Sequence, residues 1–149
     1  MATGNRSEPL TGYHFYLELD GIAEAQFREC SGLDSESNII EYKEAGKGGT
    51  TVIKKVPGEL KWSNIVLKRG ITGDMRLWEW RKQIEDGQVE SARKNGSIVL
   101  YNQMNEEVAR YNFEYGWPSK ITGPQLNANN NDIAIEEITI AHEGLKRVK

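Results

Sequence analysis

The residues of this sequence that could do chemistry are few and far apart. His14 and His142 are the only histidines, and Cys30 is the only cysteine. A zinc site needs several such ligands at short spacing, and a nucleophilic triad needs a histidine positioned beside its nucleophile. Neither pattern occurs, nor does a Gly-x-Ser-x-Gly turn. We therefore expect no metal site, and Cys30, with only Arg28 as a nearby cation, is interpreted as a structural thiol.

Two other patterns suggest chemistry only superficially. The glycine-rich stretch 45–51 resembles a phosphate-binding loop, but Gly48 stands where that motif requires a serine or threonine after Lys47, and the earlier glycine of the motif is absent. Glu136 and Glu137 could form an acid–base pair, yet adjacent residues of a strand point to opposite faces. The sequence thus predicts no enzyme and no cofactor.

Composition narrows the class of protein further. The chain has 149 residues, of which 38% are hydrophobic and 28% charged, with a net charge of −3. These values predict one globular domain over residues 1–149 and no specific nucleic-acid binding. No apolar run approaches the roughly 18–20 residues of a membrane span, and no secretory leader opens the chain. We therefore expect the protein to be made and assembled in the cytoplasm.

The strands that would position these residues can be predicted from hydrophobic periodicity. Strict alternation predicts strands, and an Asp-Gly dipeptide at 20–21 predicts a tight hairpin. The strand at 108–117 is expected to place Tyr115 and Trp117 on its core face. The final strand changes parity after Ile135, which predicts a bulge near Glu136-Glu137 or burial on both sides. The predicted strands are 13–19, its return at about 23–27, 38–44, 60–69, 98–101, 108–117 and 132–142, followed by an exposed basic tail at 144–149.

The most aromatic segment is 61–84, which reads as a strand followed by a helix from about 74 to 86. Leu77, Trp80 and Ile84 share one helical face, whereas Trp78 lies off that stripe. These four residues are expected to pack the helix against the domain or a neighbour, and a ligand platform is the alternative. The pattern as a whole predicts a mainly β protein, an antiparallel β-sandwich or barrel of about seven or more strands with one flanking α-helix.

Three surface features have no core periodicity. Residues 1–11 read as a flexible N-terminal arm, and residues 43–59 as a protruding loop or long hairpin, which in a compact domain is usually functional. The polar side of the strand at 108–117 carries Arg110, Asn112 and Glu114, a candidate solvent-facing row. The candidate contact residues of the protruding segment are Lys43, Glu44, Lys54, Lys55, Pro57 and Glu59.

An ordered set of short motifs resembles the inner tube proteins of contractile phage tails and phage-tail-like injection systems. This T-even-type tail tube family is related in fold to the haemolysin-coregulated protein of type VI secretion. The resemblance covers Tyr13 to Leu145, and its specificity lies in the ordered set. The motifs are Tyr16-Leu-Glu-Leu-Asp-Gly-Ile, Ser31-Gly-Leu-Asp-Ser-Glu, Ile40-Glu-Tyr-Lys-Glu, Pro57-Gly, Asn64-Ile-Val-Leu-Lys-Arg-Gly-Ile-Thr, Leu77-Trp-Glu-Trp-Arg, Gly116-Trp-Pro-Ser-Lys, Gly123-Pro and Ile135-Glu-Glu-Ile-Thr-Ile-Ala-His-Glu-Gly-Leu.

The resemblance implies a structural subunit. Family members form hexameric rings that stack into a hollow tube inside a contractile sheath, so the implied partners are the chain itself, the sheath, the baseplate or spike, the terminator and cargo in the lumen. On this basis we expect residues 43–59 to reach an adjacent ring or subunit, with polar contacts from Lys54, Lys55 and Glu59. Arg110, Asn112 and Glu114 are then lumen candidates. The tube would belong to a phage-tail-like particle that can be released from the cell. Two alternatives stay open: the tail tube of a DNA-delivering phage, and a monomeric β-sandwich that binds a ligand.

Overall fold

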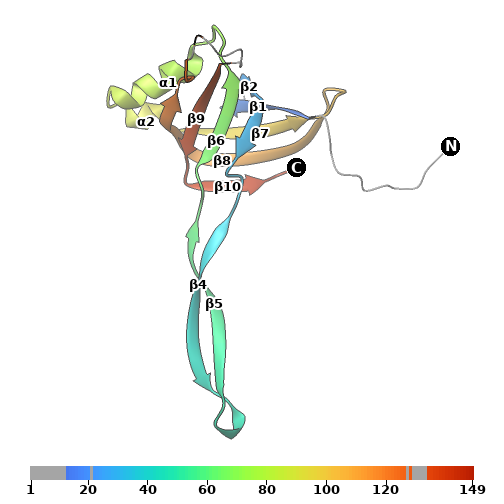
Figure 1. The fold of residues 1–149 in the computed structure, drawn as a ribbon, viewed down its shortest axis with the longest axis vertical. Helices are drawn as coiled ribbons and strands as arrows, with labels where there is room; N and C mark the ends of the chain where they lie inside the picture. The colour runs from blue at the N-terminus through green and yellow to red at the C-terminus, as the bar shows by residue number, and fades with distance from the viewer. Residues whose placement is uncertain (1–12, 21, 127, 129–133) are drawn as a thin grey trace, which may run out of the picture.

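The computed structural model describes residues 13–20, 22–126, 128 and 134–149, so the predicted arm at 1–11 lies outside the described residues. The protein is mainly antiparallel β with one main helix, as the sequence predicts. Two helices, α1 (Arg76–Glu85) and α2 (Val89–Ala92), lie beside the sheet (Figure 1). The strands are β1 (His14–Leu19), β2 (Ile22–Phe27), β3 (Glu29–Ser31), β4 (Glu36–Ala45), β5 (Thr51–Lys61), β6 (Ile65–Gly70), β7 (Lys94–Tyr101), β8 (Glu107–Thr122), β9 (Ile135–Ala141) and β10 (Gly144–Arg147), with a 3-10 turn at Lys47–Gly49.

Eight of the strands form one curved sheet. Its order is β2-β1-β7-β8-β9-β6-β3, and β10 pairs with the N-terminal half of β8. Because β3 follows β2 in the chain and the Arg28 amide donates to the Lys68 carbonyl at 2.9 Å, the two ends of the sheet meet. The result is a barrel-like body whose core lies inside the curve.

Alternating side chains fill that core. Leu17, Ile65, Ile98 and Ile140 are fully buried, and Phe113 is 1% exposed at their centre. Phe113 needs a glycine next to it, because a Cβ at Gly116 would lie 2.3 Å from its ring. The core members are Leu17, Leu19, Ala25, Phe27, Ile65, Leu67, Leu77, Trp80, Ala92, Ile98, Phe113, Ile138 and Ile140.

Strands β4 and β5 form a separate two-stranded ribbon that stands away from the barrel (Figure 1). Its base is fixed to the barrel by close packing. Gly32, at φ +86°, lies so near the Asn64 carbonyl that a Cβ would be 2.0 Å from that oxygen. The His142 ring lies against Trp62, and its Nε2 is 3.0 Å from the Ser63 carbonyl oxygen. The direction of the ribbon is therefore set by the barrel.

The predicted strand 60–69 is wrong as a single element. Lys61 ends β5, residues 62–64 cross to the barrel, and β6 begins at Ile65. Pro57 and Gly58, a turn signal in the sequence, lie inside β5. Pro57 pairs with Ile39, next to a shift in the ribbon register. A two-stranded ribbon tolerates proline because each strand has one free edge.

The expected core positions of Tyr115 and Trp117 are corrected by a break in β8. Tyr115 adopts φ +52° and is 52% exposed, whereas Gly116 is buried after it. Alternation therefore restarts at Gly116, leaving Trp117 only partly buried. The expected exposed tail is also partly wrong, because Gly144–Arg147 forms β10 along β8.

The bulge predicted near Glu136-Glu137 is wrong, and so is burial on both sides. Strand β9 pairs with β6 without a register shift from Ile135 to Ile140. Glu136 points inward with Ile138 and Ile140, while Ile135 is 37% exposed. The parity change in the sequence arises because a buried glutamate, not an isoleucine, occupies the first inward position.

Helix α1 begins and ends close to the predicted residues. The Asp74 carboxylate accepts the Arg76 amide at 3.0 Å at its start, and Gly87, at φ +81°, follows its end. Neither helix in the described part of the chain has the length and apolarity of a membrane span.

Candidate assembly surfaces

The ribbon is the least covered part of the described chain. Every residue of β4 and β5 is exposed except Asn38 and Gly58, which are half-buried. Its exposed apolar side chains include Ile39, 68% exposed, and Ile53, 57% exposed. An isolated hairpin is marginally stable in water, and exposed apolar groups in such number mark a contact surface. The seven large exposed apolar residues are Ile39, Ile40, Tyr42, Val52, Ile53, Val56 and Leu60.

Both faces of the ribbon combine apolar and charged side chains. On one face Ile40 lies opposite Val56, and on the other Lys43 lies opposite Ile53. The lysine and glutamate pairs are weak, as shown by Lys55 and Glu41, which are 3.8 Å apart with both side chains more than half exposed. All six candidate contact residues lie on the ribbon and are exposed: Lys43, Glu44, Lys54, Lys55, Pro57 and Glu59.

A second surface is the outer face of β1, β7 and β8, here called the polar face. Arg110 crosses it, donating to Glu18 at 2.7 Å and to Glu107 at 2.7 Å. The hydrogen bond to Glu18 raises the pKa of Arg110 further, against the effect of burial. Partial burial opposes the ionisation of Glu107, but bonds from Arg110 and Lys149 outweigh it and lower the pKa of Glu107.

The remaining predicted solvent-facing residues lie on the same strand. Asn112 is exposed and bonds to Ser97 at 2.6 Å, and Glu114 is exposed opposite Gly144. Arg110 is half-buried, and its hydrogen bonds go to Glu18 and Glu107. The strand alternation predicted for β8 therefore describes residues 109–113, and on this face Arg110 forms ion pairs with Glu18 and Glu107.

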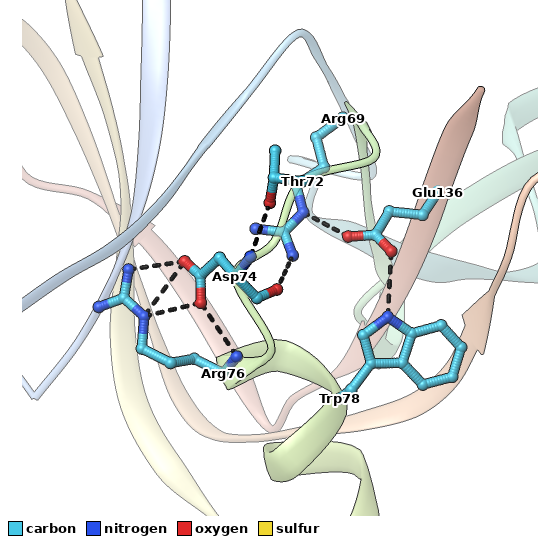
Figure 2. A network of polar contacts seen from close by, with 6 residues as sticks. All are labelled: Arg69, Thr72, Asp74, Arg76, Trp78 and Glu136. Carbon is cyan, nitrogen blue, oxygen red and sulfur yellow. Dashed lines mark hydrogen bonds and ion pairs between the residues drawn. The ribbon is translucent and has the colours of Figure 1, made fainter. Parts of the chain in front are cut away.

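The only buried ion pair in the described part of the chain joins the barrel to α1 (Figure 2). Arg69, 4% exposed, donates from Nε to Glu136 at 2.6 Å, and Glu136 also accepts the Trp78 indole N–H at 3.0 Å. A second Arg69 nitrogen donates to the Asp74 carbonyl at 3.1 Å. Its guanidinium lies 5.8 Å from the centre of the Phe27 ring. This pair therefore connects β2, β6, β9 and α1.

The tryptophan helix faces its own barrel. Trp80 is 4% exposed and donates to the Ala92 carbonyl at 2.7 Å, and Leu77 is 2% exposed. Ile84 packs against the same core, while Trp78 is half-buried on Glu136. The indoles are thus structural and do not form an open ligand platform.

Chemically reactive groups are not brought together. Cys30 is half-buried at β3, and burial raises its pKa to about 12. Among the described residues no group of three or more His, Cys, Asp or Glu side chains could hold a metal ion. His14 instead stacks on Tyr101, and His142 supports the base of the ribbon.

Sequence reasoning missed the Arg69–Glu136 pair, although a signal was present. Arg69 has the parity of Ile65 and Leu67, and Glu136 has that of Ile138. Opposite charges falling on the apolar rows of two strands indicate a buried pair. The sequence contains no comparable signal for the base of the ribbon, because its contacts join Gly32, Ser63 and His142 from three distant segments.

A barrel with a free-standing apolar ribbon and a polar outer face defines a class of protein that is completed by other copies or partners. The profile of the T4-like virus tail tube protein gp19 family matches residues 11–146, so the chain belongs to this tail tube family. No curated protein sequence gave a significant match.

Solved structures agree with this membership. A chain of the PVC sheath-tube complex in the extended state, an extracellular contractile injection system, is 30% identical, with TM-score 0.79 and coverage of 95% of this chain and 93% of that one. A chain of the anti-feeding prophage tube-terminating cap is 29% identical, with TM-score 0.82 and coverage of 99% and 95%. Hcp1 from Flavobacterium johnsoniae shares the fold alone, at 16% identity and TM-score 0.57 over 90% and 94%.

Proposed function

We propose that this chain is the inner tube subunit of a contractile injection system, in which hexameric rings stack into a hollow conduit. The observation that carries the proposal is the ribbon, which exposes seven large apolar side chains on two faces. A ribbon uncovered on both faces fits between neighbouring subunits, where its apolar groups leave water. Lys43, Glu44, Lys54, Lys55, Pro57 and Glu59 make contacts there with an adjacent ring or subunit.

The sheet supplies a route to ring closure. The two ends of the main sheet meet, but β10 pairs only with β8, so its outer edge is free among the described strands. Joining this edge to a different surface of the next copy is a head-to-tail contact, which closes a ring and covers the edge. The polar face then lines the lumen, with Arg110, Asn112 and Glu114 toward the cargo.

Similarity favours an injection system over the tail tube of a DNA-delivering phage, because the PVC and anti-feeding prophage chains match along nearly the whole length. The partners are the sheath, the baseplate and spike, the terminator and cargo in the lumen. The subunit acts mechanically and catalyses nothing. It assembles in the cytoplasm and is released as part of an extracellular particle.

Deletion of Gly46–Thr51 tests the role of the ribbon. The six residues close the ribbon tip and contribute nothing to the barrel core. The deletion variant should keep its melting temperature and fail to polymerise, as followed by sedimentation and electron microscopy. A matched control replaces Gly46–Thr51 by a scrambled sequence of the same length. Normal tubes from the deletion variant would refute the assignment of the ribbon.

A further inference from the structure

We propose that the turn between β7 and β8, residues 102–106, docks in a groove between β2 and the β6–α1 loop of a second copy. The inference rests on the proposed self-assembly and names two surfaces that bring neighbouring copies together. It assigns a role to Met104 and Glu106 on one side, and to Phe27 and Arg28 on the other.

The groove has a volume of about 640 Å³ and is open to solvent. Phe27 and Ala25 line its apolar part, and Arg28 lies exposed on its border. Beside it the β6–α1 loop presents Ile71 and Met75, each 57% exposed. A groove of this size with an apolar floor and a cation at its border suits an apolar side chain followed by a carboxylate.

The loop that forms one wall of the groove is held in place by the network of Figure 2. Arg69 bonds to the Asp74 carbonyl, and the Asp74 amide donates to the Thr72 hydroxyl at 3.2 Å. The Ile71 amide also donates to the Ala134 carbonyl at 3.0 Å. Because these bonds exist in the single chain, little ordering of this wall is needed on binding.

The β7–β8 turn is equally well ordered. The Asn102 side-chain oxygen accepts amides of Met104 and Glu106, each at 2.9 Å. Asn105 adopts φ +59°, and its side-chain oxygen is 3.1 Å from His14 Nε2. The turn holds Met104 outward at 77% exposure. An ordered turn that exposes a methionine is suited to bind an apolar surface, because little ordering is needed on binding.

Opposite charges on the turn and on the groove favour one orientation of the turn in the groove. Glu106 is exposed one turn position beyond Asn105, and Arg28 has no ion-pair partner among the described residues. Met104 can enter the apolar floor beside Phe27, since a thioether makes favourable contacts with an aromatic ring. Glu106 then meets Arg28 at the border of the groove.

The sheet register places the two surfaces at one level. Phe27 lies opposite Phe15, Phe15 opposite Leu100, and Leu100 opposite Ala109, so the turn begins just beyond the level of Phe27. Within one chain β1 separates β2 from the turn, and Met104 stays exposed. A copy displaced sideways along the sheet brings its turn to the groove at nearly the same height, which is a head-to-tail contact.

Two charge reversals test the pairing. Glu106→Arg and Arg28→Glu should each raise the concentration at which assembly begins by about tenfold or more, because each places like charges together. An equimolar mixture of the two variants should co-assemble near the wild-type concentration, since alternating copies restore every Arg–Glu contact. The double variant should also recover. Glu90→Arg on α2, an exposed reversal elsewhere, should assemble normally, and all variants should melt within a few degrees of wild type.

Unimpaired assembly of either single variant would overturn the inference, as would a mixture that stays dissociated while both proteins are folded. These outcomes are separate from failure of the proposed function. That failure would appear as a wild-type protein that never assembles, or as a Gly46–Thr51 deletion that still forms tubes.

Discussion

Arg69 and Glu136 place opposite charges on rows of β6 and β9 that are otherwise apolar. Their side chains are 5% and 6% exposed, so neither charge is solvated by bulk water. Each depends on the other and on the Trp78 indole and the Asp74 carbonyl for compensation. A pair of this kind adds little net stability over well-packed apolar residues but holds α1 in one orientation on the barrel.

We predict that Glu136→Ala destabilises the protein by about 3–5 kcal/mol, because the Arg69 charge remains buried without its partner. The double variant Arg69→Met with Glu136→Leu should recover most of this loss. Urea unfolding followed by tryptophan fluorescence measures both. Equal stability of Glu136→Ala and wild type would contradict the compensation described here.

Asp74 makes stability depend on acid pH. Hydrogen bonds from the Arg76 side chain and then from its amide lower the pKa of Asp74 from 3.8 to about 2. Because the folded pKa is depressed, the stabilisation is complete above about pH 4 and is lost as the pH falls toward 2. In Asp74→Asn this contribution is absent, so the difference in unfolding free energy from wild type should shrink between pH 5 and pH 2. A difference that stays constant over this range would contradict the assignment.

A strand can be located from sequence when it buries one face and exposes the other. Strand β1 and the first part of β8 bury one face, so strict alternation locates them and their hairpin partners. The ribbon buries neither face, so it carries no hydrophobic period. The strand predicted at 38–44 lies within β4, but residues 43–59 could be predicted only as a protruding loop or long hairpin, without the 11-residue strand β5. The prediction of a bulge in β9 was wrong because hydrophobic periodicity cannot distinguish a buried, paired Glu136 from an exposed one.

Some of the candidate surfaces could be predicted from sequence and one could not. The six ribbon residues lie on two strands that are neighbours in the chain, and Arg110, Asn112 and Glu114 lie on one strand, so sequence position alone could propose both sets. The groove is built from β2 and the β6–α1 loop, and its relation to the β7–β8 turn depends on strand order. No pattern along one chain encodes that order.

The ribbon should lose assembly without losing stability when its apolar groups are removed. Ile40→Thr with Ile53→Thr keeps β-branched side chains on exposed strand positions, so the unfolding free energy should change by no more than about 0.5 kcal/mol. Polymerisation should fall sharply in sedimentation assays. Leu126→Thr, which alters an apolar residue that is 82% exposed outside the ribbon, is the matched control and should polymerise normally. Unimpaired polymerisation of the ribbon variant would argue against burial of these side chains.

For the whole molecule, the polar face should become the inner wall of the tube. Asn112→Cys should react with a bulky polyethylene-glycol maleimide in free subunits and become protected in assembled tubes, whereas Glu79→Cys on the outward side of α1 should react in both. Native Cys30 gives little background, because burial raises its pKa to about 12. Protection of position 79 with continued labelling of position 112 would reverse the assignment of inside and outside.

A single copy of this chain exposes surfaces that assembly into a tube would cover. Its ribbon is uncovered, the outer edge of β10 is free among the described strands, and the Arg110–Glu18 pair lies on an open surface. In the proposed assembly, ring formation covers the β10 edge and stacking covers the ribbon. If the protein were instead a monomeric β-sandwich that binds a ligand, these surfaces would stay exposed to water.

Electron microscopy of the purified protein over a range of concentrations tests the central claim most directly. We predict hollow tubes or stacked rings with sixfold symmetry, which increase with concentration and are absent from the Gly46–Thr51 deletion. Single subunits at every concentration, with the protein folded, would contradict it.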